Sequence, residues 1–96
     1  MTYELDFHES ALKEWSSLDK GIRNRLHKKL KRRLVDPKVK SAELRGDLAG
    51  CYKVKDAVSG YRLIYEIFEH EVVVIVLSVG KRDKFLAYLA AALRRR

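Results

Sequence analysis

The chain has 96 residues, of which 47% are hydrophobic and 35% are charged. That balance supports one folded domain with an ordinary core and leaves no room for a second. The formal net charge of +8 favours a polyanionic partner, either nucleic acid or an acidic protein. The sequence has no apolar leader and no long apolar run, so we expect a cytoplasmic protein with no membrane association. The single cysteine, Cys51, excludes an internal disulfide, and we expect it in the core.

The first part of the sequence predicts one strand followed by two helices. Apolar and polar residues alternate over residues 2–7, which is typical of a half-buried strand. Residues 9–18 carry apolar side chains, Trp15 among them, at helical spacing. Asp19 can cap a second helix, which Pro37 ends. Apolar residues recur every four positions on one side of that helix, which we expect to face the core: Ile22, Leu26, Leu30 and Leu34.

The other face of the second helix is strongly basic. No acidic residue occurs between Gly21 and Val35. The same stretch holds seven cationic residues, namely Arg23, Arg25, Lys28, Lys29, Lys31, Arg32 and Arg33. Such a run is either a solvated face or a surface that binds a polyanion, and its charge exceeds what solubility requires. We therefore predict that this helix contacts RNA, with the candidate residues Lys28, Lys29, Lys31 and Arg32.

The second part predicts a meander of three strands and a final helix. Residues 51–55 and 61–68 read as a hairpin, 72–79 as a central strand apolar on both faces, and 84–93 as a helix. The predicted fold class is α+β. A small antiparallel β-sheet, made of the N-terminal strand and the meander, is flanked by two N-terminal helices and a C-terminal helix. Residues 1–96 are predicted to form a single domain.

Candidate catalytic residues come from the hairpin, because the sequence lacks the usual signatures. There is no glycine-rich phosphate loop and no Cys/His metal motif, so we expect no metal and no cofactor. Period-two alternation places an apolar set on one face, namely Tyr61, Leu63, Tyr65 and Ile67. Arg62 must then point to the opposite face. If the strands pair as a hairpin, Lys53 and Lys55 share that face with Arg62.

More cations follow the central strand, where Arg82 and Lys84 precede the last helix and Tyr88 lies one turn beyond. Such groups can cleave RNA without a metal. The 2′-hydroxyl attacks the adjacent phosphate once a base removes its proton, while cations stabilise the added charge and an acid protonates the leaving 5′-oxygen. A tyrosine can stack on a base. The alternative interpretation is a basic surface with a partly buried tyrosine.

Five segments in order along the chain resemble the RelE branch of the RelE/ParE toxin superfamily. They are residues 12–15, 44–46, 51–55, 60–65 and 78–82, reading LKEW, LRG, CYKVK, GYRLIY and SVGKR. The resemblance implies an mRNA endonuclease that acts in the ribosomal A site without a metal. It further implies Lys55 as general base, Arg82 as general acid, Lys53 and Arg62 as stabilisers of the transition state, and Tyr88 as the residue that stacks on the codon base. Arg45 and Lys84 match positions that hold RNA, although Lys84 stands where an arginine is familiar.

The resemblance also implies a partner, an acidic antitoxin of the RelB type that covers or displaces the last helix. The net charge of +8 and the apolar stripe Phe85, Leu86, Leu89 and Leu93 suit such a partner. Two alternatives remain open at this point. One is a ParE-like toxin that inhibits gyrase, against which Lys53, Lys55, Arg62 and Arg82 argue. The other is a non-catalytic nucleic-acid-binding module, since the basic helix alone gives salt-dependent affinity.

Overall fold

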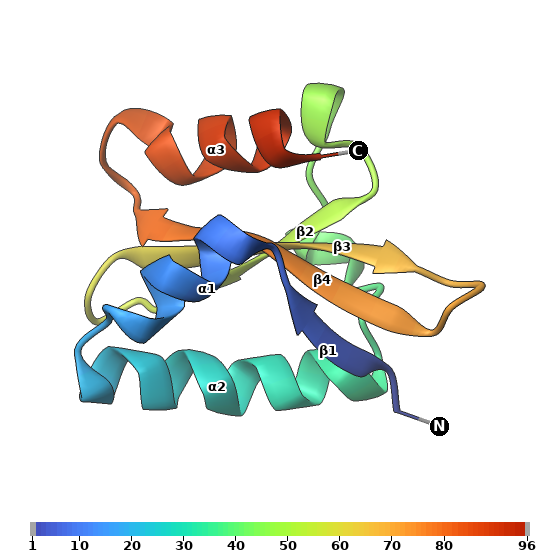
Figure 1. The fold of residues 1–96 in the computed structure, drawn as a ribbon, viewed down its shortest axis with the longest axis horizontal. Helices are drawn as coiled ribbons and strands as arrows, with labels where there is room; N and C mark the ends of the chain where they lie inside the picture. The colour runs from blue at the N-terminus through green and yellow to red at the C-terminus, as the bar shows by residue number, and fades with distance from the viewer. Residues whose placement is uncertain (1, 96) are drawn as a thin grey trace.

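The computed structural model describes residues 2–95, except for the side chain of Lys84. The elements are β1 (Glu4–Phe7), α1 (Glu9–Ser16), α2 (Lys20–Val35), β2 (Cys51–Lys55), β3 (Tyr61–Phe68), β4 (Val73–Lys81) and α3 (Leu86–Arg94). Short 3-10 helices cover Lys40–Ala42, Gly46–Leu48 and Asp83–Phe85. The helices α1 and α2 lie on one side of the sheet, and α3 lies on the other (Figure 1). The predicted α+β class and its helices are confirmed.

The sheet is mixed, which corrects the prediction of a purely antiparallel sheet. Its strand order is β1-β4-β3-β2, and the meander β2-β3-β4 is antiparallel throughout. The strand β1, however, pairs with β4 in the parallel direction, with Glu4 opposite Val73 and Phe7 opposite Val76. A tight turn would force antiparallel pairing, but two helices follow β1 before the chain returns to the sheet. The direction of β1 is therefore not fixed by a hairpin.

The two N-terminal helices begin at side-chain caps. The imidazole Nδ1 of His8 accepts a hydrogen bond from the Ser10 N–H at 3.1 Å, and Asp19 Oδ2 accepts one from the Gly21 N–H at 3.0 Å. The predicted cap at Asp19 is thus confirmed. Helix α2 ends at Val35, just before Asp36 and Pro37, because proline disfavours helical backbone at the preceding residue. These caps fix where α1 and α2 begin.

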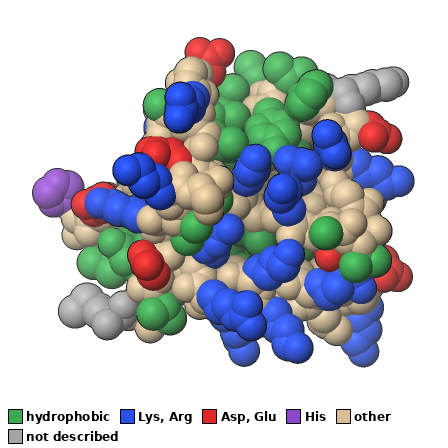
Figure 2. Space-filling model, turned by 180° about the vertical axis from the view of Figure 1, so that it is seen from behind, with side chains coloured by type: hydrophobic (Ala, Val, Ile, Leu, Met, Phe, Trp, Pro, Cys, Tyr) green, Lys and Arg blue, Asp and Glu red, His purple; other side chains and the backbone are tan. Residues whose placement is uncertain are grey.

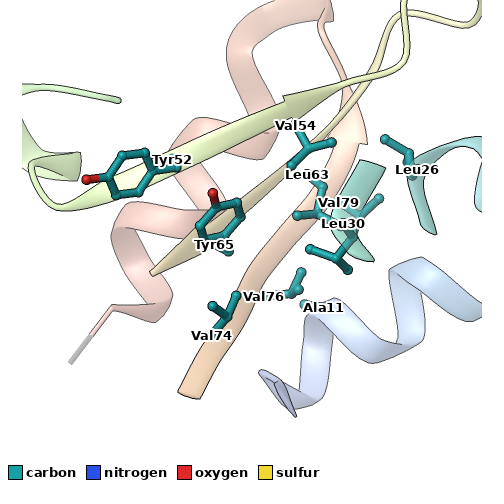
Figure 3. Close-up of a cluster of buried hydrophobic side chains, with 10 residues drawn as sticks. All are labelled: Ala11, Leu26, Leu30, Tyr52, Val54, Leu63, Tyr65, Val74, Val76 and Val79. Atoms are coloured by element: carbon teal, nitrogen blue, oxygen red, sulfur yellow. The ribbon is translucent and has the colours of Figure 1, made fainter. Parts of the chain in front are cut away.

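The main core lies between the sheet and α1 and α2. Figure 3 shows Leu26 and Leu30 of α2 and Ala11 of α1 facing side chains of the sheet, among them Tyr52, Val54, Leu63, Tyr65, Val74, Val76 and Val79. The rings of Tyr52 and Tyr65 stack with centroids 5.6 Å apart. The buried Tyr65 hydroxyl donates to the Pro37 carbonyl at 2.6 Å and accepts from Arg33. The polar end of this tyrosine is therefore satisfied inside the core.

Helix α3 covers the other face of the sheet and is held at both ends. Near its start, Ser78 Oγ donates to the Ala87 carbonyl at 2.7 Å. At its end, Arg94 makes a bidentate contact with Glu14 of α1, at 2.8 and 3.0 Å. Burial raises the pKa of Glu14, but the hydrogen bonds from Arg94 and from the Val79 N–H outweigh it and leave the pKa below its ordinary value. Glu14 thus stays charged and ties α1, β4 and α3 together.

The free edge of β2 is covered by side chains of α2. Arg33 Nη1 donates to the Lys53 carbonyl at 3.0 Å, and Lys29 Nζ donates to the Lys55 carbonyl. An exposed edge strand offers unpaired carbonyls to other chains, and long basic side chains are a common way to block them. Some of the cationic side chains of α2 therefore protect the sheet edge.

Among the described residues, no helix combines the length and the apolar character needed to span a membrane.

Replacing Leu30 by Ala should lower the free energy of unfolding by about 2–5 kcal/mol, because Leu30 is fully buried and its loss leaves a cavity. Urea denaturation measures this change. Leu12→Ala is the matched control, since Leu12 is 48% exposed and should cost well under half as much. Equal effects of the two substitutions would contradict the described core.

Candidate functional site

Three of the predicted catalytic cations meet where the ends of β2, β3 and β4 come together. Lys55 of β2 is the cross-strand partner of Arg62 on β3, so both side chains lie on the same face. The backbone N–H of Arg82 donates to the Gly60 carbonyl at 3.0 Å, which brings the end of β4 to the β2–β3 turn. Lys55, Arg62 and Arg82 line one hollow of about 230 Å³. The structure therefore brings these three together.

Lys53 lies in a second hollow that adjoins the first at Lys55. This larger hollow, of about 520 Å³, is lined by Lys29, Arg32, Arg33, Ser41, Ala42, Lys53 and Lys55. Figure 2 shows lysine and arginine side chains gathered over the part of the surface that β2 and α2 form, below the hydrophobic side chains of α3. The cationic strand residues and the cationic helix residues thus form one surface, which we call the basic face. A phosphate chain could follow it past Lys55.

Arg62 and Tyr88 contact each other directly. Arg62 Nη1 donates to the Tyr88 hydroxyl at 2.7 Å, and the guanidinium carbon lies 5.9 Å from the centre of the Tyr88 ring. The Nε of Arg62 is buried and has no hydrogen-bond partner among the described residues. Because Tyr88 belongs to α3, that helix is joined to the site through Arg62. The buried Nε is thus an unsatisfied donor beside Tyr88, while Arg62 Nη1 is engaged by the Tyr88 hydroxyl.

The face opposite the main core is less open than the alternation of β3 predicts. The predicted packed set is confirmed, since Leu63 and Tyr65 are fully buried in the main core and Tyr61 and Ile67 pack against it. The other face is also covered, because Cys51 and Ile64 are fully buried beneath α3. Small residues of α3 allow this close approach, since Ala91 packs in the cluster with Cys51 and Ile64 and Ala87 is buried. The cations therefore occupy one end of the sheet and its β2 edge.

Cys51 is a core residue, as expected. It is fully buried, and burial raises the pKa of its thiol to about 11. A thiol in that state is a poor nucleophile near neutral pH.

The cationic residues of α2 form two groups, those that are bound within the protein and those that have no partner among the described residues. Four side chains donate hydrogen bonds within the protein: Arg23 to the Leu18 carbonyl, Arg25 to Asp56, Lys29 to the Lys55 carbonyl and Arg33 to the Lys53 carbonyl. Lys28, Lys31 and Arg32 are exposed, and within residues 2–95 no hydrogen bond or ion pair involves their side chains. Of the predicted RNA contacts on α2, Lys28, Lys31 and Arg32 are thus the residues most available to a ligand.

Neither Arg45 nor Lys84, the two remaining predicted RNA contacts, can be placed in these hollows. Arg45 is exposed and precedes the short helix Gly46–Leu48, near the start of β2, and it lines neither hollow. The backbone of Lys84 lies in the short helix Asp83–Phe85, but its side chain falls outside the described residues. Among the described residues, no group of three or more His, Cys, Asp or Glu side chains could hold a metal ion.

Sequence reasoning missed an ion pair that holds the β2–β3 turn. Arg25 Nε and Nη2 donate to the two carboxylate oxygens of Asp56 at 2.9 and 3.0 Å, and Ser59 Oγ donates to Asp56 Oδ2 at 2.6 Å. The hydrogen bond from Arg25, with that from Ser59, outweighs burial and lowers the pKa of Asp56 to about 2. Asp56, the one acidic residue between Lys53 and Arg62 in the sequence, was the available signal.

Comparison with known proteins identifies the family of this chain. A family model described as the ParE toxin of the type II toxin-antitoxin system, parDE, matches residues 5–84. The mRNA interferase toxin RelE of Escherichia coli K12 is 47% identical over 94 residues, which cover 98% of each chain. Fold and sequence together define a small toxin of a type II toxin–antitoxin system. The chain belongs to the RelE/ParE toxin superfamily, as its sequence predicts.

Solved structures agree with this assignment. A variant of E. coli toxin RelE with two arginines replaced by alanine, in the free state, superposes with a TM-score of 0.91 at 45% identity and covers all of both chains. The toxin of the intact E. coli RelBE toxin-antitoxin complex superposes with a TM-score of 0.81 at 48% identity, covering 85% of this chain and 99% of that one.

The Asp56 ion pair predicts acid sensitivity between about pH 4 and pH 2. Because its pKa falls from 3.8 to about 2 on folding, Asp56 contributes stability that is present above pH 4 and lost as the pH falls through the folded value. Arg25 is 42% exposed, so after solvent screening we expect a contribution on the order of 1 kcal/mol. Urea unfolding of wild type and Asp56→Asn from pH 2 to 7 measures it. A stability difference that does not shrink below pH 4 would contradict this role.

Proposed function

We propose that the protein is an mRNA interferase toxin, a metal-independent endoribonuclease that cuts mRNA in the ribosomal A site and thereby stops translation in the cytoplasm. The observation that carries this proposal is the hollow lined by Lys55, Arg62 and Arg82, on a chain 47% identical to an mRNA interferase over nearly its full length. The side chains found there can supply a base, an acid and charge stabilisation from the protein alone.

The proposed reaction is transfer of a phosphate ester within the RNA. Lys55, as the neutral amine, takes the proton of the 2′-hydroxyl while that oxygen bonds to the adjacent phosphorus. Lys53 and Arg62 stabilise the added negative charge, because Arg62 lines the hollow beside Lys55 and Lys53 lies two residues before Lys55 on β2. The bond from phosphorus to the 5′-oxygen breaks, and Arg82 gives that oxygen a proton. The products are a 2′,3′-cyclic phosphate and a 5′-hydroxyl.

Tyr88 and the basic face position the RNA in this proposal. The Tyr88 ring is half-buried beside Arg62, where it can stack on a codon base next to the scissile phosphate. Lys28, Lys29, Lys31, Arg32, Arg45 and Lys84 are the proposed contacts to mRNA and ribosomal RNA. The ribosome orients the substrate, since positioning can lower a barrier by several kcal/mol.

An acidic antitoxin of the RelB type is the proposed inhibitor. Helix α3 exposes large apolar side chains, with Leu86 60%, Leu89 59% and Leu93 87% exposed, and it carries Tyr88. An acidic partner that covers this stripe would bury apolar area and meet a toxin of charge +8. The related E. coli toxin RelE is part of a RelBE toxin-antitoxin complex.

The second candidate function is inhibition of gyrase, because the matching family model is described as a ParE toxin. The cationic hollow and the 47% identity to an mRNA interferase favour RNA cleavage.

Purified ribosomes carrying a defined mRNA test the proposal directly. We expect cleavage in the A-site codon, 2′,3′-cyclic phosphate and 5′-hydroxyl ends, and activity that survives EDTA once ribosomes are kept intact by polyamines. Primer extension and end-specific ligation read out the products. Ends with a 5′-phosphate would indicate metal-dependent hydrolysis. Intact mRNA together with gyrase-linked DNA breaks would favour the ParE function.

Lys55→Ala and Arg82→Ala should leave folding almost unchanged but reduce the cleavage rate at least a hundredfold. Both side chains are exposed, so stability should change by about 0.5 kcal/mol or less, whereas loss of a proton-transfer group costs on the order of 10²–10⁴ in rate. Single-turnover cleavage, thermal melting and ribosome binding are measured for each variant. A variant that binds and melts like wild type yet cuts within a few-fold of its rate excludes that residue as acid or base. Loss of ribosome binding in both variants would make this a docking surface.

A further inference from the structure

The β2–β3 turn connects two proposed catalytic residues and contacts a third. Lys55 is the last residue of β2 and Arg62 the second residue of β3, so the relative position of their side chains depends on the turn between them. Gly60, at φ of +82°, allows a reversal that other residues rarely adopt, and its carbonyl accepts from the Arg82 N–H. A shift of this turn would move all three cations relative to one another.

Asp56 organises the turn from inside. It is 3% exposed, its backbone N–H donates to the Tyr61 carbonyl at 2.9 Å, and its carbonyl accepts from the Gly60 N–H at 2.8 Å. Its carboxylate accepts from Ser59 Oγ, and that oxygen in turn accepts from the Tyr61 N–H at 3.2 Å. Asp56 is thus hydrogen-bonded through its backbone and its side chain to the residues that reverse the chain.

Arg25 is the link between this turn and the rest of the fold. Its fork holds both carboxylate oxygens of Asp56 from α2, an element that is anchored in the core by Leu26 and Leu30. A bidentate arginine–carboxylate contact fixes orientation as well as distance. The turn is therefore held by a helix that packs on the face of the sheet opposite α3.

We propose that Arg25, acting through Asp56, is a positioning residue of the cleavage site, which holds Lys55, Arg62 and Arg82 in their reactive arrangement. This role rests on the proposed function. Arg25 itself need not touch RNA, because its guanidinium is already engaged by Asp56. A displacement of about 1 Å at reacting groups can cost a hundredfold in rate, so a residue remote from the phosphate can affect the chemical step.

The test compares Arg25→Gln with Lys20→Gln, a substitution that removes the same charge from the same helix. Lys20 is exposed, lies at the start of α2 and belongs to none of the proposed contacts. Single-turnover cleavage is measured over a range of ribosome concentrations, at a temperature where every variant is folded by circular dichroism. Arg25→Gln should lower the rate at saturating ribosomes by about ten- to hundredfold with half-saturation within about twofold of wild type. Lys20→Gln should match wild type in both.

Three further variants show whether Arg25 works through Asp56. Asp56→Asn should lower the saturating rate like Arg25→Gln, and the double variant should be no slower than the slower single variant, because both remove one contact. Arg25→Lys keeps the charge without the fork and should restore part of the rate. Additive losses in the double variant would overturn the coupling. A rate at saturation equal to wild type in Arg25→Gln, with only weaker ribosome binding, would overturn the positioning role and make Arg25 a phosphate contact.

Hydrogen exchange of the Gly60 and Arg82 amides separates this proposal from the proposed function. In Arg25→Gln both amides should exchange faster than in wild type, and by a larger factor than amides of the core strand β4, which should change only as much as the measured loss of global stability predicts. Unchanged exchange at the turn would overturn the positioning role even if cleavage is lost. If wild-type protein cuts no ribosome-bound mRNA, the proposed function fails, and the catalytic part of this inference fails with it.

Discussion

Burial of β4 on both faces is the constraint on which the rest of the structure depends. Val74, Val76 and Val79 pack against α1 and α2, while Leu77 packs on the side of α3. A strand covered on both sides requires helices in two layers, and a chain of 96 residues has few segments to supply them. Helix α3 must therefore cover the sheet directly after β4 ends. That requirement places Tyr88 against Arg62 and leaves the apolar stripe of α3 facing outward.

Packing of the helices on the sheet also determines which cationic side chains meet an acidic partner. Three acidic residues form ion pairs with arginines: Glu14 with Arg94, Glu66 with Arg95, and Asp56 with Arg25. Each pair joins elements that are distant in sequence. No such acid pairs with Lys53, Lys55 or Arg82 in the part of the chain that is described. Concentrated like charge opposes folding, so a cationic hollow of this kind is better explained by an anionic ligand than by stability.

The sequence predicted the elements well because apolar periodicity and caps are local signals. Ile22 to Leu34 gave the length of α2, Asp19 its start, and the alternation of Tyr61 to Ile67 the packed face of β3. The parallel pairing of β1, the coverage of Cys51 and Ile64 by α3, and the Arg25–Asp56 pair were not predictable in this way. Each joins segments far apart in the chain, and spacing alone carries no record of which distant side chains meet. The division of the basic run of α2 was not predictable for the same reason, because Lys29 and Arg33 donate to carbonyls of β2, a strand that follows much later in the chain.

The contact between Arg62 and Tyr88 links the proposed chemistry to the proposed regulation. Arg62 is positioned from two sides, by the β2–β3 turn that Arg25 holds and by the hydroxyl of Tyr88 at 2.7 Å. The first support belongs to the rigid layer of α2, whereas the second belongs to α3, whose outer face is apolar and exposed. A partner that binds α3 and shifts it would leave Lys55 and the turn in place while removing Tyr88 from Arg62. Inhibition would then require displacing one helix of the toxin, and the catalytic hairpin would keep its fold throughout.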